Sequence, residues 1–198
     1  MGVTNGAGLS LRYFRDTFAP GTSYEELTAL AADTPAGSDG LMWVPYLFGE
    51  RTPHLDPNAR AAFVGITASH TRAHFVRAVL EGVAFSLRDT LTLFNELDVP
   101  VRAIRLGGGG ARGPLWRQVQ ADVYGHPVEL LEAEEGGAFG AALLAGTGIN
   151  AWSSVEAACA ATLRVAEIIA PKDAAAMSEA YKHYRKVYPA LKTIASPA

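Results

Sequence analysis

The sequence predicts an α/β fold with a partly parallel sheet. Residues 103–106 and 128–131 are short apolar segments of strand length, and each is followed by a segment of helical character, at 114–123 and 136–145. Strands that alternate with helices in this way are typical of parallel strands joined by helical crossovers. The length of 198 residues suits one domain, or one domain with a small appendage, and is sufficient to bury a sizeable core.

Before this central unit, the chain predicts two short helices and two short strands. Residues 11–18 fit a short amphipathic helix, and Ser23 with Glu26 has the spacing of a capping box that begins the next helix. Residues 41–48 and 62–67 are expected as strands. The first of them contains a proline, which has no N–H for a strand ladder and therefore favours an edge or irregular strand.

The longest helix is expected to begin at Thr71 and to continue to Phe94, because apolar residues recur there at helical spacing. Gly82 lies in its middle, where glycine costs about 1 kcal/mol relative to alanine. We therefore expect another backbone to approach the helix closely at Gly82. Arg77 and Glu81 are predicted to form a weakly stabilising pair on the face opposite the apolar stripe.

The C-terminal part of the chain contains an apolar segment at 155–163 and predicts a final helix at 174–188. The apolar stripe of this last helix is interpreted as a packing face and its basic side as solvent-exposed, in preference to a surface for nucleic acid. Cys159 is the only cysteine, so an intramolecular disulfide is excluded, and it is expected as a small buried thiol.

The composition argues against several classes of protein. The formal net charge is −3 and acidic and basic residues are interspersed, so no nucleic-acid partner is expected. The N-terminus lacks the pattern of a signal peptide, and the longest apolar stretch is about half of the roughly 20 residues that span a bilayer. We therefore expect a cytoplasmic protein without membrane contact. The five histidines have no paired spacing for a metal site.

The four glycines Gly107 to Gly110 are the strongest indication of a ligand site. An expected strand delivers the chain to them, and a helix begins soon after them near Pro114. Glycine lets a backbone approach a ligand that a Cβ would exclude, and a helix N-terminus favours a phosphate or another polar group. A plain tight turn would need only one or two glycines, so contact with a ligand is the preferred interpretation.

The same turn also fits the dinucleotide fingerprint. Gly108, Gly110 and Gly113 have its spacing, and Glu132 lies where an acid would hold a ribose. Spacing alone therefore leaves a nicotinamide or flavin enzyme open. Against it, the fingerprint usually follows the first strand of its domain, whereas about half of this chain precedes the turn.

Two other polar segments have two interpretations each. Glu134 and Glu135 precede the small-residue helix expected at 136–145, where acids complement the helix dipole. The small residues of that helix predict that it packs closely against another segment. The loop 50–56 concentrates charge between two expected strands, and it is either a solvated loop or a functional one.

Several segments together resemble the FGGY carbohydrate kinases, and within this family they are most similar to the xylulokinases. The motifs occur in the family's order over nearly the whole chain, at 8–16, 46–59, 63–67, 75–82, 106–116, 135–142 and 184–191. The loop at 46–59 resembles the xylulokinase loop almost residue for residue. Gly137 departs from the pattern, because proline is common at its position.

The resemblance implies an actin-like ATPase fold, of the ribonuclease H-like type, in which two domains hold ATP and sugar in the cleft between them. Residues 1–198 are similar to the C-terminal, nucleotide-binding domain of such a kinase, without its N-terminal sugar-binding domain and with an incomplete sheet. The residues that match nucleotide-side positions of the family are Gly8, Arg12, Gly108, Gly109, Gly110 and Ala111. Arg12 stands where other members carry a different polar residue, which weakens the assignment of its contact.

The activity that the resemblance implies is the ATP-dependent phosphorylation of a ketopentose, D-xylulose to D-xylulose 5-phosphate, with Mg²⁺ carried by the ATP. Phosphoryl transfer needs a base for the attacking hydroxyl and loops that cradle the phosphates, and in the family both precede this segment. No catalytic residue is therefore assigned to this chain, and the chain alone is expected to be inactive. ATP and the sugar are the expected partners, and a homodimer is left open. A non-catalytic nucleotide-binding or assembly module is the alternative.

Overall fold

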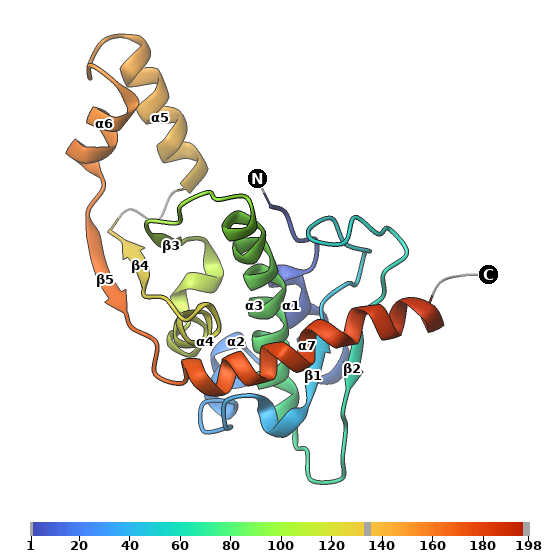
Figure 1. The fold of residues 1–198 in the computed structure, drawn as a ribbon. Coiled ribbons are helices and arrows are strands. Elements are labelled where there is room, and N and C mark those ends of the chain that lie inside the picture. Colours follow the sequence, from blue (N-terminus) through green and yellow to red (C-terminus); the bar gives the residue numbers. More distant parts are fainter. Residues whose placement is uncertain (1, 133–135, 196–198) are drawn as a thin grey trace.

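A computed structural model describes residues 2–132 and 136–195. The long helix α3 (Arg72–Glu96) runs through the middle of the molecule, and the C-terminal helix α7 (Ala174–Ala195) crosses it in the view of Figure 1. A small sheet lies on one side of α3 and a two-stranded ribbon lies on the other, whereas α5 and α6 project away from the rest (Figure 1). None of the helices in these residues is both long and apolar enough to cross a membrane.

The helices and strands that the sequence predicts are present, some with different ends. The elements before α3 are α1 (Ala7–Phe18), α2 (Tyr24–Leu30), the 3-10 helix η1 (Ser38–Gly40), β1 (Met42–Val44) and β2 (Ala62–Val64). The elements after it are β3 (Ile104–Leu106), the 3-10 helix η2 (Gly109–Arg112), α4 (Pro114–Tyr124), β4 (Val128–Leu131), α5 (Gly136–Gly148), α6 (Val155–Thr162), β5 (Val165–Ile169) and α7. Strand β1 is shorter than expected and ends before Pro45, which cannot donate to a ladder.

The sheet confirms the predicted α/β class with partly parallel strands. Its order is β3-β4-β5, with β3 parallel to β4 and β5 antiparallel to β4. Strands β1 and β2 form a separate antiparallel ribbon. Strand β5 was not predicted from the sequence. It pairs with a strand more than 30 residues earlier in the chain, a long-range contact that local patterns do not reveal.

Two hydrophobic clusters share α3 between them. One includes residues of α3, α4, α7 and β4, and the other packs α1 and α2 against β1 and α3. Met177, Tyr181 and Tyr184 of α7 are buried in the first cluster, which confirms the packing face predicted for the last helix. Because α3 contributes to both clusters, it connects the sheet side of the molecule to the side that carries α1.

The predicted close approach at Gly82 is confirmed. A Cβ built on Gly82 would lie 2.0 Å from the carbonyl oxygen of Trp43 in β1. Real Cβ atoms essentially never lie this close to another heavy atom, so β1 and α3 can pack at this distance only because residue 82 is glycine. Glycine at this position lowers the helix propensity of α3, but it allows the main chains of α3 and β1 to come into contact.

Arg77 and Glu81 do not lie on an exposed face, and the expectation of a weak surface pair is wrong. Their side chains are 6% and 2% exposed, and Arg77 Nε donates to Glu81 Oε1 at 2.6 Å. Glu81 also accepts from the Gly37 N–H at 3.0 Å and from the Ser38 hydroxyl at 3.0 Å. Burial raises the pKa of Glu81, while Arg77 acts in the opposite direction. The pair fastens the η1 turn to the middle of α3.

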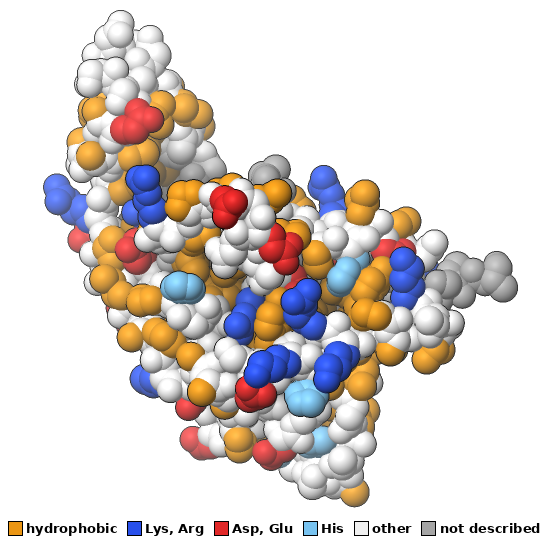
Figure 2. Space-filling view, in the orientation of Figure 1, with side chains coloured by type: hydrophobic (Ala, Val, Ile, Leu, Met, Phe, Trp, Pro, Cys, Tyr) orange, Lys and Arg blue, Asp and Glu red, His pale blue; other side chains and the backbone are white. Residues whose placement is uncertain are grey.

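Helix α5 shows the close packing that its small residues predict at Gly146, where a Cβ would lie 2.3 Å from Cζ3 of Trp152, but most of the helix is exposed. It contains no charged residue, yet Leu143 is its only buried residue in the described part of the chain. It contacts α6, and together they form the projection at the upper left of Figures 1 and 2, where few charged side chains are visible. Cys159 of α6 is partly exposed, not buried as expected. The predicted dipole contribution of Glu134 and Glu135 concerns residues outside the described ranges.

Candidate functional site

The glycine turn follows β3 directly and ends at α4. Gly108 has a φ of 75°, in the left-handed region that favours glycine. The chain then makes the single turn of η2, in which the Ala111 N–H donates to the Gly108 carbonyl at 3.1 Å. Gly113 is the N-cap of α4, and Pro114 occupies the first helical turn, as the sequence predicted.

Three of the four glycines face open space. A Cβ built on Gly107, Gly108 or Gly109 would meet no described atom within 4 Å beyond its chain neighbours. Gly110 differs, because a Cβ there would lie 2.9 Å from Nε1 of Trp116. The packing of the chain therefore accounts for Gly110, and the φ angle accounts for Gly108. Neither reason applies to Gly107 and Gly109, and both leave the backbone accessible to a ligand.

Arg117 links this turn to the sheet, and this role was not predicted from the sequence. Its Nε donates to the carbonyl oxygen of Ala111, and its Nη1 lies 3.0 Å from Glu167 Oε2 of β5. A guanidinium presents several donors in one plane, so a single side chain can hold both partners. Glu167 is brought to the turn by the position of β5. No local pattern in the sequence indicates its contact with Arg117. Arg117 therefore fixes the position of the C-terminal side of the turn.

A second open helix start lies at α1, where the predicted residues Gly8 and Arg12 are found. Gly6 is the N-cap, and no described side chain caps the first turn. Gly8 is exposed, and a Cβ on it would meet no described atom within 4 Å outside its own helix. Arg12 follows one turn later, so it lies on the same face of α1, and its side chain is exposed. Uncapped N–H groups and a nearby cation make this helix start suitable for an anion.

The glycine turn and the start of α1 are supported by connected parts of the hydrophobic core. Leu11 of α1 and Leu115 of α4 each pack against both hydrophobic clusters. The helix that carries Gly8 and the first turn after the glycines therefore rest on the same apolar support. The structure shows this shared support, and it places the six predicted nucleotide-side residues at two helix starts.

The charged loop after β1 is not simply solvated. Glu50 is 2% exposed, and its carboxylate accepts hydrogen bonds from Thr4, Asn5 and Arg51. Further along the loop, His54 stacks on Tyr188 of α7 with ring centroids 3.7 Å apart. Burial lowers the pKa of His54. The interpretation of the loop as a solvated surface is wrong for Glu50 and His54.

A cleft of about 210 Å³ lies between this loop, the end of α3 and α7. Its lining includes Tyr46, His54, Asp89 and Arg185. Asp89 accepts a hydrogen bond of 2.5 Å from the Tyr181 hydroxyl, and burial raises the pKa of its carboxyl. None of the predicted site residues lines this cleft, so it is separate from the glycine turn.

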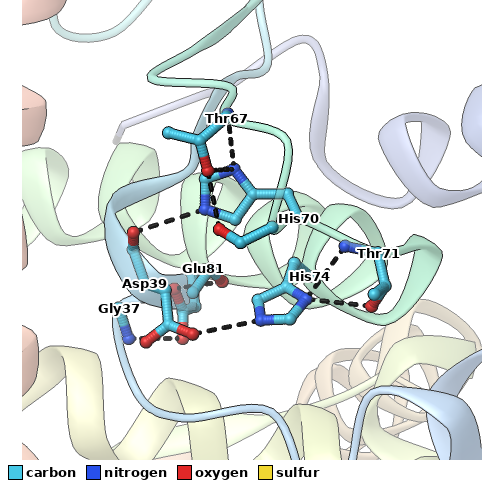
Figure 3. A network of polar contacts seen from close by, with 9 residues as sticks. Gly37, Asp39, Thr67, His70, Thr71, His74 and Glu81 are labelled. Atoms are coloured by element: carbon cyan, nitrogen blue, oxygen red, sulfur yellow. Dashed lines mark hydrogen bonds and ion pairs between the residues drawn. The ribbon is translucent and has the colours of Figure 1, made fainter.

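Two histidines take part in a polar network at the start of α3 (Figure 3). His74 Nε2 lies 3.1 Å from Asp39 Oδ2, and its Nδ1 accepts from the Thr71 N–H at 3.2 Å. His70 Nδ1 accepts from the Thr67 N–H at 2.9 Å. Both rings therefore have structural partners that hold the loops before α3. Across residues 2–132 and 136–195, no group of three or more His, Cys, Asp or Glu side chains is placed to hold a metal ion.

Comparison with known proteins assigns the chain to a family. Residues 5–149 match the C-terminal domain of the FGGY family of carbohydrate kinases. A xylulose kinase from Bacillus subtilis (strain 168) is 43% identical over 172 residues, which cover 87% of this chain and 34% of that protein. A xylulose kinase from Staphylococcus epidermidis is 39% identical over 191 residues, which cover 96% of this chain and 38% of that protein. A gluconokinase from Bacillus subtilis is 38% identical over 154 residues, 72% of this chain and 30% of that protein.

Solved structures agree with this assignment. A xylulose kinase structure from Brucella ovis superposes with a TM-score of 0.88 at 31% identity, covering 98% of this chain and 40% of that one. A gluconate kinase structure from Lactobacillus acidophilus gives a TM-score of 0.87 at 29% identity, covering 95% of this chain and 39% of that one. The described residues thus have the actin-like ATPase fold of these C-terminal domains, as the resemblance implied. This chain spans less than half of the length of each of these relatives.

Proposed function

Because the chain belongs to the FGGY family of carbohydrate kinases, we propose that it holds the ATP of a sugar kinase. In this proposal, residues 1–198 are the C-terminal, nucleotide-binding domain. The sugar-binding domain belongs to the part of the relatives that this chain does not match. Two findings support this division: residues 5–149 match the C-terminal domain of the family, and the matched segment covers only 38% of the Staphylococcus epidermidis xylulose kinase. The fit to the actin-like fold leaves the dinucleotide-enzyme alternative without support, since its fingerprint rested on spacing alone.

The observation that carries the proposal is the open glycine turn at the end of β3. The backbone of Gly108 to Ala111 receives the adenosine, because a flat ligand can approach where three glycines leave no Cβ in the way. The phosphates extend towards the uncapped start of α1, where the N–H groups near Gly8 and the guanidinium of Arg12 favour negative charge. Mg²⁺ enters with the ATP phosphates, and no protein ligand is assigned to it.

The contribution of this chain to phosphoryl transfer is positioning. Transfer to a hydroxyl depends on aligning the γ-phosphoryl group with its acceptor and on neutralising charge, with little covalent chemistry by the protein. Gly108 to Ala111 fix one end of the nucleotide and the start of α1 fixes the other. The base that takes the hydroxyl proton lies outside the assigned residues, so the chain alone binds ATP without turning it over.

The sugar we propose is a ketopentose, D-xylulose. Two of the relatives described above are xylulose kinases, at 43% and 39% identity. The gluconokinase at 38% identity makes gluconate the competing substrate. These percentages lie close together, so the sugar has to be measured in a protein that also carries a sugar-binding domain.

Nucleotide binding is tested by isothermal titration of the purified chain with ATP. Gly109→Asp is the informative variant, because it places a carboxylate in open space at the turn without disturbing packing. Gly110→Asp would also collide with Trp116, so a loss of binding there would be ambiguous. Gly140→Asp is the matched control, since a Cβ at Gly140 in α5 likewise meets no described atom within 4 Å outside its own helix. We expect Gly109→Asp to weaken binding at least about tenfold and Gly140→Asp to leave it unchanged. Equal binding by both variants would remove the glycine turn from the site.

Activity is tested in a chimera in which this chain replaces the matching segment of the Bacillus subtilis xylulose kinase. We expect ADP release that depends on both ATP and D-xylulose. In the chimera, Gly109→Asp should raise KM for ATP while KM for the sugar stays the same, because the two substrates bind to different domains. ATP- and xylulose-dependent ADP release by the isolated chain would contradict the assignment of the base to another part of the enzyme.

A further inference from the structure

The carboxylate of Glu50 joins two parts of the chain that are far apart in the sequence. Its Oε2 accepts from the Thr4 hydroxyl at 2.7 Å, and its Oε1 accepts from the Asn5 N–H at 3.0 Å. The Arg51 N–H also donates to Oε1, at 2.7 Å. The Glu50 side chain is almost completely buried, so these donors replace the water that would otherwise solvate its charge.

The loop that carries Glu50 is itself fixed in place. Glu50 and Asp56 exchange two main-chain hydrogen bonds, at 2.8 and 2.9 Å. Two residues after Glu50, Thr52 donates its N–H to the Val3 carbonyl at 3.0 Å, and its hydroxyl accepts from the Val3 N–H at 3.0 Å. The loop therefore holds Val3, Thr4 and Asn5 in sequence, through both main-chain and side-chain groups.

The segment held in this way leads directly into α1. Asn5 is followed by Gly6, the N-cap, on which a Cβ would lie 1.9 Å from the Pro45 carbonyl oxygen. Gly8, the second residue of the helix, follows two positions later. A displacement of Thr4 and Asn5 would thus change the position of the first N–H groups of α1, which no described side chain caps.

We infer that Glu50 is a positioning residue for the nucleotide: it sets the start of α1 so that Gly8 and Arg12 face the phosphates of ATP. The inference rests on the proposed function and adds a residue that does not itself touch the ligand. A carboxylate suits this role because it accepts an N–H and an O–H at the same time with charge-assisted hydrogen bonds. Glutamine has the same size but carries no charge, and its NH₂ group would make the Thr4 hydroxyl an acceptor, so the charge-assisted hydrogen bonds from Thr4, Asn5 and Arg51 would be lost.

The test measures ATP affinity and amide hydrogen exchange on the whole chain for four variants. Glu50→Gln and Thr4→Val each remove part of the contact, and Thr4→Ser restores the hydroxyl. The control for Thr4→Val is Tyr181→Phe, which likewise removes a hydroxyl donor from a buried carboxylate, Asp89, away from α1. Circular dichroism establishes the temperature at which all four are folded.

We expect Glu50→Gln and Thr4→Val to weaken ATP binding by about tenfold and to speed amide exchange at Asn5. Thr4→Ser should bind as the wild type does, and Tyr181→Phe should bind equally well although it is less stable. If Glu50→Gln binds ATP as tightly as the wild type, or if Asn5 exchanges no faster, the inference is wrong while the proposed nucleotide site remains. A wild-type chain that binds no ATP would remove that site and the positioning role with it.

Discussion

Replacing Gly82 by alanine tests the packing of α3 on β1. In an exposed helix this change would stabilise the protein by up to about 1 kcal/mol, because alanine has the higher helix propensity. At Gly82 the new Cβ would lie 2.0 Å from the Trp43 carbonyl oxygen, 2.9 Å from its carbonyl carbon and 3.0 Å from its Cβ. Two of these atoms are main chain, so no side-chain rotation relieves the contact.

Relief therefore requires β1 to move away from α3. Both elements contribute to the buried clusters, and a forced separation of a packed core typically costs about 1–3 kcal/mol, occasionally more. With the gain in propensity subtracted, we expect Gly82→Ala to lower the free energy of unfolding by about 1 kcal/mol, and by about 2 kcal/mol at the upper end of the packing cost.

The measurement is urea unfolding followed by far-ultraviolet circular dichroism, with Gly140→Ala as the matched control. Gly140 lies in α5, and a Cβ there meets no described atom within 4 Å outside its own helix, so this variant should be as stable as the wild type or slightly more stable. The reasoning is refuted if Gly82→Ala unfolds at the same urea concentration as Gly140→Ala.

Three further variants test polar contacts of the fold. Glu81→Gln should destabilise by about 3–5 kcal/mol in urea unfolding, because it leaves the buried charge of Arg77 uncompensated; a loss below 1 kcal/mol would argue against burial of the pair. Tyr188→Phe removes the 2.6 Å hydrogen bond that lowers the pKa of Asp56 below its ordinary 3.8. A lowered pKa stabilises the fold above pH 3.8 and this contribution is lost as pH falls through the folded-state pKa, so the variant should show a shallower loss of stability in acid, measured as urea midpoint against pH. Asp122→Ala should cost about 1–2 kcal/mol, because one oxygen of Asp122 accepts from the two main-chain N–H groups that precede α7; an unchanged melting temperature would contradict this capping role.

The helices were the most predictable part of the fold, because their signals are local. Ser23 and Glu26 form the predicted capping box at the start of α2, and Pro114 begins α4 where expected. Apolar spacing located α3 nearly to its ends, from Arg72 to Glu96. Each of these features depends on residues within a few positions of one another, so the sequence contains the whole signal.

The partners in contacts between distant segments could not be predicted. The spacing of Arg77 and Glu81 is the same for an exposed and for a buried pair, and only the η1 turn, brought to Glu81 by tertiary packing, decides between them. The same limitation explains why Arg117 was missed, since its partner Glu167 is 50 residues later. Helix α5 shows the limit of a local signal: its small residues predict close packing, and among the described residues this is found at Gly146 while most of the helix is exposed.

The glycines show how the structure sharpens an ambiguous sequence signal. The sequence suggests the same reason for glycine at positions 82 and 109: another backbone or a ligand comes so close that a Cβ would not fit. The structure separates them, because a Cβ at Gly82 would collide with Trp43, whereas a Cβ at Gly109 would meet no described atom within 4 Å beyond its chain neighbours. Packing therefore explains Gly82 completely. Packing of the described residues does not explain Gly109, whose φ is also not in the left-handed region, and this agrees with the proposed approach of a nucleotide to the turn. This is why Gly109→Asp, which leaves the packing of the chain undisturbed, is the variant that tests the nucleotide site most directly.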